Sequence, residues 1–305
     1  MTPVVSLQQV SKRYRQTVAL DNVSLDVPPG TVCALLGANG AGKSTSLKIL
    51  LGLERPDSGR AEVLGMDSSR YDLEIRRRVG YVPEHLSLYD WMTVAEIGWF
   101  AAGFYSPGYQ RVYAQYTSRF GLEDSQKIKT LSKGQRAKVA LSLALSHKPE
   151  LLILDEPTSG LDALVRREFL ESMVDVAAEG RSVLLSSHQV SEVERVADMV
   201  AILLNGKLVC VERLEDLKRE TREVTVTLGD VHMRPPDIPG DTLAHVQFGH
   251  EHIWMVRNLD ESRLAESVGL NTPFQVRHPS LEDILLVMLR EYRRSPTDNL
   301  IESTV

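Results

Sequence analysis

A glycine-rich stretch of the chain has residue types and spacing suited to binding phosphate. It runs from Gly37 to Ser44 as GANGAGKS, fits the spacing G-x-x-x-x-G-K-[ST] and follows an apolar run. Glycines let backbone N–H groups turn inward around a phosphate, and a helix starting near Lys43 would add the partial positive charge of its N-terminus. Lys43 can place its ammonium between the β- and γ-phosphates of a nucleotide, and Ser44 can offer an oxygen to Mg²⁺. The order of strand, loop and helix argues against a chance glycine-rich turn.

Two adjacent acids form a second group of residues that could take part in chemistry. Asp155 and Glu156 directly follow the aliphatic run Leu151–Leu154, which is typical of a buried strand. A solvated strand end explains one acid better than two adjacent ones. Asp155 would lie beside Mg²⁺ and contact it through a water molecule. Glu156 is placed to accept the proton of an attacking water. Together the two groups predict a P-loop NTPase, and no narrower class.

These groups need a sheet that brings distant segments together. Apolar runs at Val32–Leu36, Leu151–Leu154 and Val183–Ser186 predict buried strands, and residues 162–178 predict a helix between the last two. Strand, helix and strand in this order imply a parallel sheet with right-handed crossovers. The predicted fold is therefore of the α/β class.

Segments outside this sheet have their own patterns. The first thirty residues predict short strands joined by turns, and residues 91–148 predict mainly helices. Residues 220–294 begin with strand-like alternation and end with an amphipathic helical pattern at Leu281–Glu291, which predicts a small α+β accessory domain. The polar segment 295–305 is predicted to be disordered.

Three further segments are similar to motifs of the ABC ATPases and follow one another in that family's order. Leu131–Gln135, with the sequence LSKGQ, resembles the family's signature. It lies shortly before the predicted strand that is followed by Asp155 and Glu156. Ser159–Asp162, with the sequence SGLD, resembles the D-loop. His188 follows a predicted strand and resembles the switch histidine, which would contact the γ-phosphate and hold the attacking water.

Two more positions extend the resemblance, which covers about residues 4–215. Tyr14 matches the aromatic residue that stacks on adenine, and Glu84 stands at the Q-loop position. The resemblance implies a RecA-like P-loop NTPase core in residues 1–219, with an N-terminal antiparallel β subdomain and a helical signature subdomain at about 88–148.

The resemblance also implies roles for individual residues, with ATP and Mg²⁺ as cofactors. Catalysis would fall to Lys43, Glu156 and His188, and Mg²⁺ would lie near Ser44, Glu84 and Asp155. The residues implied to contact ATP are Tyr14, Gly37, Ala38, Asn39, Gly40, Ala41, Gly42, Lys43, Ser44, Thr45, Ser132, Gly134 and Gln135. In this family the signature helix caps the γ-phosphate held by the opposite subunit. The resemblance therefore implies a head-to-tail homodimer around two ATP molecules.

Two residues depart from the family's usual motifs. Lys133 replaces a glycine of the signature and adds a cation near the partner's ATP. Glu84 replaces a glutamine, so it cannot donate an amide hydrogen bond and adds a negative charge near Mg²⁺. The Pro83-Glu84 pair is similar to exporter ATPases of the two-component kind, as are residues 162–170 and 279–283. ATPase activity is therefore expected to survive both departures.

The bulk composition bears on partners. The net charge of −6 gives no electrostatic reason to expect nucleic acid. No apolar run reaches the about 20 residues that span a bilayer, and the N-terminus lacks the pattern of a secretory signal. If the chain drives transport, a separate polytopic membrane permease must cross the membrane. The chain is then expected in the cytoplasm, peripheral on the inner face of the cell membrane.

Other functions of this ATPase class fit the sequence less well. Ribosome-acting relatives usually carry two phosphate cradles, whereas this chain has one. Chromosome-type relatives separate their halves by a long coiled coil, but only about ninety residues separate Lys43 from Ser132. A P-loop nucleotide kinase gives no reason for the signature. The subunit of an exporter is the favoured interpretation, and a soluble ATPase acting on nucleic acid or ribosomes is the alternative.

Two further features allow more than one interpretation. Aromatic residues concentrate between Tyr89 and Phe120, and a helical core is favoured over a docking groove for a membrane subunit, although the two can coexist. His250 and His252 form an H-x-H pair, for which a polar hairpin turn is favoured over a metal site, because a metal would need further ligands.

Overall fold

The computed structural model describes residues 2–230, 233–269 and 272–294. Residues 295–305, for which disorder is predicted, lie outside the described residues. The chain divides into two compact units between Val211 and Glu212, eight residues before the predicted boundary at 219/220. The difference arises because α8 (Leu214–Glu220) and Glu212, which precedes it, belong to the second unit. The carboxylates of Glu212 and Glu220 form ion pairs with Arg257 of that unit.

A six-stranded sheet forms the centre of the first unit, with the order β10-β9-β3-β8-β7-β6. Neighbouring strands from β9 to β6 run parallel, as predicted. Every residue of β3 and β7 is buried, which explains why their sequences are continuous apolar runs without alternation. The strands are β3 (Val32–Leu36), β6 (Val79–Val82), β7 (Leu151–Asp155), β8 (Ser182–Ser187), β9 (Met199–Leu204) and β10 (Lys207–Arg213).

An antiparallel sheet with the order β2-β1-β4-β5 covers the N-terminal part of this unit. Its strands are β1 (Val5–Tyr14), β2 (Thr17–Val27), β4 (Ser58–Val63) and β5 (Met66–Asp67), and the helices near it are α1 (Lys43–Leu50) and α2 (Asp72–Arg78). One hydrophobic core serves both sheets, because Val5 and Leu25 belong to the same buried cluster as Leu47 and Ile153. The phosphate-binding stretch is therefore anchored between two sheets.

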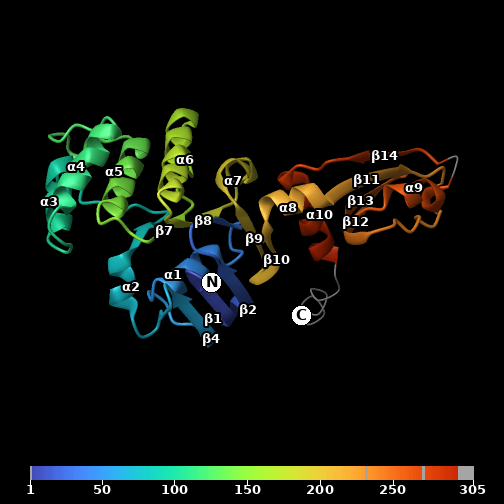
Figure 1. The fold of residues 1–305 in the computed structure, drawn as a ribbon, viewed down its shortest axis with the longest axis horizontal. Helices are drawn as coiled ribbons and strands as arrows, with labels where there is room; N and C mark the ends of the chain where they lie inside the picture. Colours follow the sequence, from blue (N-terminus) through green and yellow to red (C-terminus); the bar gives the residue numbers. More distant parts are fainter. Residues whose placement is uncertain (1, 231–232, 270–271, 295–305) are drawn as a thin grey trace. The chain divides into compact units, whose positions relative to one another are not determined.

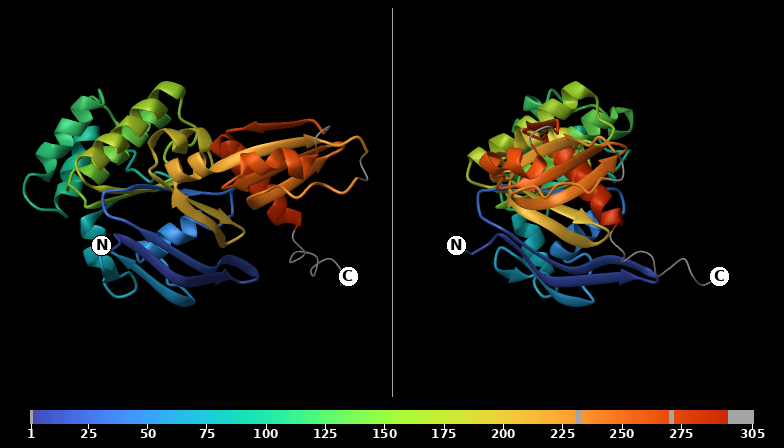
Figure 2. Two further views of the ribbon diagram at one scale, coloured as in Figure 1. Left: turned by 45° about the vertical axis from the view of Figure 1, so that its right-hand side comes forward. Right: turned by 90° about the vertical axis from the view of Figure 1, so that its right-hand side faces the viewer.

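Three helices form a separate group with its own core: α3 (Val94–Ala102), α4 (Tyr109–Arg119) and α5 (Lys133–Leu145). They lie apart from the antiparallel sheet in every view (Figure 1; Figure 2). The Tyr113 hydroxyl donates to the carbonyl oxygen of Val94 at 2.8 Å, and Gly98 leaves room for the Tyr113 ring. Trp91 and Trp99 remain exposed, so a helical core accounts for only part of the aromatic cluster. Helices α6 (Ala163–Ala178) and α7 (Val190–Val196) complete the unit.

The second unit is a small α+β body, in agreement with the predicted class. Its antiparallel sheet has the order β12-β13-β11-β14. The elements are β11 (Thr221–Thr227), β12 (Asp241–Phe248), β13 (Glu251–Arg257), α9 (Glu261–Val268), β14 (Phe274–Arg277) and α10 (Leu281–Arg294). The structure corrects one part of the H-x-H interpretation. His250 lies in the β12–β13 turn, but His252 is buried within β13 and contacts the ring of His245.

Candidate active site

The phosphate-binding stretch connects β3 to α1, and its glycines are required by backbone geometry. Gly40 and Gly42 have φ angles of 82° and 108°, which side chains of L-residues rarely adopt. A Cβ atom at Gly42 would lie 2.4 Å from the carbonyl oxygen of Ala19, and one at Gly37 would lie 2.4 Å from that of Leu203. The loop therefore closes tightly on the neighbouring strands while its other side lines a cavity.

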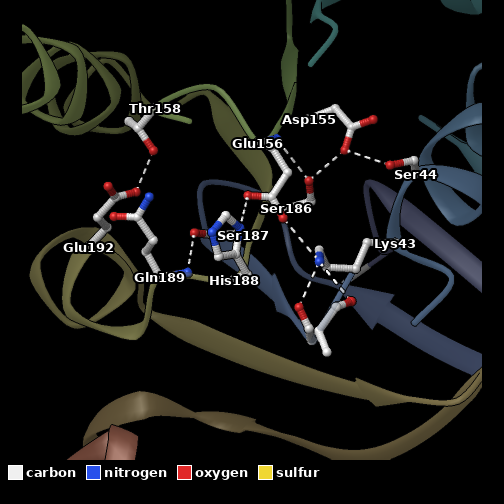
Figure 3. Close-up of polar contacts among 12 residues, drawn as sticks. Lys43, Ser44, Asp155, Glu156, Thr158, Ser186, Ser187, His188, Gln189 and Glu192 are labelled. Atoms are coloured by element: carbon white, nitrogen blue, oxygen red, sulfur yellow. Dashed lines mark hydrogen bonds and ion pairs between the residues drawn. The ribbon is translucent and has the colours of Figure 1, made fainter. Parts of the chain in front are cut away.

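Lys43, the first residue of α1, is only 6% exposed. Its ammonium donates to the carbonyl oxygens of Gly37 and Ala38, at 2.6 Å and 3.2 Å, and forms an ion pair with Glu156 Oε1 at 3.0 Å. Figure 3 shows these contacts converging on one nitrogen. Burial of an ammonium is costly unless it is paired and hydrogen-bonded, and these three oxygens supply the compensation. A nucleotide phosphate offers the same kind of anionic oxygen to this cation.

Asp155, the last residue of β7, is buried and bound by two hydroxyl groups. Ser44 Oγ and Ser186 Oγ donate to Asp155 Oδ1 at 3.1 Å and 2.6 Å. One carboxylate and one adjacent hydroxyl oxygen are the hard oxygen donors that Mg²⁺ prefers, and Mg²⁺ usually takes few ligands from the protein. The donor set of Ser44 and Asp155 therefore fits this ion. Ser186 was not predicted as part of the site, although its place directly before Ser187 and His188 in the sequence is a usable signal.

Glu156 is held in an unusual backbone conformation at the centre of the site. Its φ angle is 46°, its amide donates to Ser186 Oγ at 3.0 Å, and the residue is only 8% exposed. Glu156 Oε2 lies 2.7 Å from His188 Nδ1, and Oε1 contacts Lys43 (Figure 3). Positive φ angles at non-glycine residues store strain and cluster at functional sites. The carboxylate is thus fixed between two basic groups that come from different segments.

The cavity beside the phosphate-binding stretch has a volume of about 390 Å³. Its lining comprises Thr17, Ala19, Asn39, Gly40, Ala41, Gly42, Lys43, Ser44, Thr45, Glu84 and Glu156. Tyr14 does not line it; this residue ends β1, is 40% exposed and has Lys12 Nζ 5.4 Å from its ring centroid. Burial, together with the nearby charges of Asp155 and Glu84, raises the pKa of Tyr81 to about 12. The site therefore carries negative charge from the two acids as well as the buried cation.

The signature residues lie elsewhere in the first unit. Ser132 is the N-cap of α5: its hydroxyl accepts from the Gln135 amide at 3.2 Å, and Gln135 Oε1 accepts from the Ser132 amide at 2.9 Å. Gly134 is packed closely, because a Cβ there would lie 3.0 Å from Val165. Ser132, Gly134 and Gln135 do not line the cavity of the phosphate-binding stretch. The phosphate-binding stretch and the signature thus form two separate groups within one chain, and Tyr14 lies outside the cavity as well.

Comparisons with known proteins identify the family of this chain. The family model described as ABC transporter matches residues 20–159. An uncharacterized ABC transporter ATP-binding protein of Nostoc sp. is 39% identical over 229 residues, which span 70% of this chain and 68% of that protein. The chain belongs to the ABC transporter family, as an ATP-binding subunit.

Two other matches add detail to this ABC subunit. A probable multidrug ABC transporter ATP-binding protein of Escherichia coli is 34% identical over 72% of this chain and 38% of that protein. A dimeric post-hydrolysis state of an ATP-binding cassette, bound to ADP and Pi, superposes with a TM-score of 0.63 and 26% identity, covering 69% of this chain and 98% of that one. Such relatives support ATPase activity for the ABC subunit in general. Within residues 2–230, 233–269 and 272–294, none of the helices has the length and apolar content needed to cross a bilayer.

Proposed function

We propose that this ABC subunit hydrolyses ATP with Glu156 as the general base and Lys43 and His188 as its catalytic partners. The observation that carries the proposal is the convergence of these three side chains, with distances of 3.0 Å and 2.7 Å to the two oxygens of one carboxylate. Glu156 accepts a proton from the attacking water, and His188 orients that water and the carboxylate. Lys43 moves its charge-assisted contacts from the protein's oxygens to those of phosphate. Ser44 and Asp155, with Glu84 nearby, would hold Mg²⁺, which would supply neutralisation of phosphate charge.

Two copies of the chain are proposed to close around two ATP molecules. The phosphate-binding stretch and Ser132 with Gly134 form separate groups in one chain, so the N-terminus of α5 has no phosphate of its own to cap. A head-to-tail arrangement with twofold symmetry pairs each cradle with the signature of the other copy. The dimeric relative bound to ADP and Pi supports this arrangement. Lys133, exposed beside Ser132, adds a cation at the same surface.

The transport partner is proposed to be a separate polytopic permease, which this subunit drives in the export direction. A cavity of about 690 Å³ opens beside the helical group, and aromatic and aliphatic side chains line much of it, among them Leu53, Tyr89, Phe100, Phe104 and Tyr105. An exposed apolar cavity of this size suits the insertion of a helix from a partner. The name of the multidrug relative and the Pro83-Glu84 pair support the export direction. We therefore propose that the subunit acts in the cytoplasm, peripheral on the inner face of the cell membrane, with the second unit as an accessory domain.

Two neighbouring residues of α3 provide the test of permease binding. Phe100 lines the cavity and is 38% exposed, whereas Trp99 is 65% exposed and does not line it. The tagged chain should copurify a polytopic membrane protein from detergent-solubilised membranes. Phe100→Ser should reduce the recovered permease by about 10-fold, the effect expected for losing a buried aromatic anchor, while Trp99→Ser should retain it. Equal recovery with both variants, or no copurifying membrane protein, would contradict this partner.

A further inference from the structure

Glu192 is a buried acid near the active site that the proposed chemistry does not use. It lies in the first turn of α7, four residues after His188, and is only 3% exposed. Its Oε2 accepts the hydroxyl of Thr158 at 2.5 Å, and its Oε1 forms an ion pair with Arg166 Nε at 3.1 Å. A charge this deeply buried is costly unless it is paired, and a well-packed apolar residue would often serve stability better. The placement therefore calls for an explanation beyond stability.

The contacts of Glu192 join the two segments that carry Glu156 and His188. Thr158 stands two residues after Glu156, in the loop between β7 and α6, and is itself buried. Besides the hydrogen bonds of Ser186 to Asp155 and Glu156, the same pair of segments has two further side-chain contacts. These are His188 with Glu156 and Glu192 with Thr158, as Figure 3 shows. Two separate contacts between short segments fix both their distance and their relative direction, which one contact cannot do.

Arg166 extends this connection to the D-loop. It lies in the first turn of α6, and its Nη2 donates to the carbonyl oxygen of Leu161 at 3.1 Å. The Leu161 amide in turn donates to the carbonyl oxygen of Thr158 at 3.1 Å. A single carboxylate therefore connects the His188 turn, the loop after Glu156 and the backbone of residues 159–162.

We propose that Glu192 is a positioning residue for ATP hydrolysis, which holds His188 and the D-loop in register with Glu156 through Thr158 and Arg166. It touches neither the phosphate-binding stretch nor Lys43 in the contacts that the structure describes, so it acts on the rate of the chemical step and not on nucleotide binding. Misplacing a catalytic group by about 1 Å can cost on the order of 10²-fold in rate. The inference rests on the proposed function, because its readout is ATP turnover.

The test uses the full chain and pairs each disruptive variant with a conservative one. Thr158→Val keeps the side-chain shape and removes the hydroxyl, whereas Thr158→Ser keeps the hydroxyl. Glu192→Gln removes the charge that pairs with Arg166 at nearly constant volume. We expect Thr158→Val and Glu192→Gln to lower kcat by about 10- to 100-fold while the KM for ATP and the Kd for MgATP change by less than about twofold. Thr158→Ser should keep kcat within about threefold of the wild-type value.

A control separates positioning from stability. Glu223 is also a buried acid, in the second unit, and is paired with Arg277. Glu223→Gln should lower the thermal midpoint and leave kcat unchanged. If Thr158→Val and Glu192→Gln also lower the thermal midpoint but keep wild-type kcat at a temperature where both are folded, the positioning role is wrong. If, in that case, the wild-type chain hydrolyses ATP and Glu156→Gln stops hydrolysis, only the positioning inference fails and the proposed function stands. A wild-type chain without turnover would overturn the proposed function and the inference with it.

Discussion

Each unit buries a carboxylate in an ion pair, but the two pairs are built differently. In the first unit Glu156 contacts Lys43 and His188, which follow β3 and β8, whereas Glu156 itself follows β7. In the second unit Glu223 contacts Arg277, its partner across the β11–β14 ladder, at 2.6 Å. The side chains of Glu156 and Glu223 are 8% and 7% exposed, so their burial is nearly equal.

The comparison shows that burial of charge does not by itself indicate reactivity. A cross-strand pair such as Glu223 with Arg277 needs only two neighbouring strands and contributes to the stability of a sheet. The Glu156 group needs three segments that meet at the carboxyl ends of parallel strands, where ligands bind in open α/β sheets. Glu156 also has a positive φ angle, whereas Glu223 lies in a regular strand. Convergence of segments and backbone strain therefore distinguish the candidate active site.

The largest expected difference between the two acids concerns turnover. Glu156→Gln keeps the shape and removes the basicity, so kcat should fall by about 10²- to 10⁴-fold, the usual contribution of a positioned base. MgATP should still bind with near wild-type Kd. Glu223→Gln should leave kcat unchanged and reduce the free energy of unfolding by about 1–3 kcal/mol, as expected for losing hydrogen bonds to a charged group. Steady-state phosphate release measures kcat, and thermal unfolding measures stability. A similar kcat for the two variants would contradict the distinction between a catalytic and a stabilising acid.

Removing the cation of each pair sharpens the comparison. Lys43→Ala deletes a charge-assisted contact to phosphate and should weaken ATP binding by about 10- to 100-fold. Arg277→Ala should leave the Kd for ATP unchanged, because Arg277 belongs to a stabilising pair of the second unit. Isothermal titration with ATP is the measurement. Tight ATP binding by Lys43→Ala would show that Lys43 does not bind the phosphates.

Tyr14 tests how far the nucleotide site extends beyond the phosphates. Stacking of a base on an aromatic ring contributes about 1–3 kcal/mol, so Tyr14→Ala should raise the Kd for ATP several-fold or more, and Tyr14→Trp should be tolerated. The exposed ring position outside the described cavity leaves it accessible to a base. Equal Kd values for both variants would show that Tyr14 is only a strand residue with a surface phenol.

A smaller effect is expected from two histidines, half-buried His147 of the first unit and buried His252 of the second. Burial lowers the pKa of His252 in the second unit, and burial lowers that of His147 in the first. The unfolded chain then binds more protons than the folded one as pH falls below about 6.5, so stability is fully present above that pH and decreases below it. The slope for one such histidine is at most about 1.4 kcal/mol per pH unit. Chemical unfolding at pH 7.5 and 5.5 should show this loss, and His252→Phe should diminish it; an unchanged loss would exclude His252 as its source.

Much of the first unit was predictable because its motifs and its strands give independent signals. The apolar runs at 32–36 and 151–154 predicted β3 and β7 to within one residue, and the glycine spacing predicted the start of α1 at Lys43. Short strands such as β6 and β14 were not predicted, since four residues are too few to show a clear period. The division between Val211 and Glu212 lies eight residues before the predicted boundary. Composition does not reveal the ion pairs of Glu212 and Glu220 with Arg257, which join α8 to the second unit.

Details of the site that depend on tertiary contact were not predictable. The position of Ser186 before His188 could have placed it near the site, but it does not indicate that Ser186 binds Asp155. No local pattern indicates that Glu192 meets Thr158 across two segments. The predicted polar hairpin turn was wrong for His252, because the polar neighbours His250 and Glu251 do not show that His252 begins the buried face of a strand. Motif spacing predicted which residues carry the chemistry, but the partners that orient them come from packing.

The proposed closure of two copies around ATP is tested most directly by light scattering of Glu156→Gln. The account predicts a shift from monomer to dimer on adding MgATP and no shift with ADP, because contacts across the interface exist only with the γ-phosphate in place. Adding Ser132→Arg should abolish the shift while ATP remains bound, since Ser132 is exposed and does not line the cavity. A double variant that still dimerises on MgATP would contradict the role of the signature and the two-site mechanism.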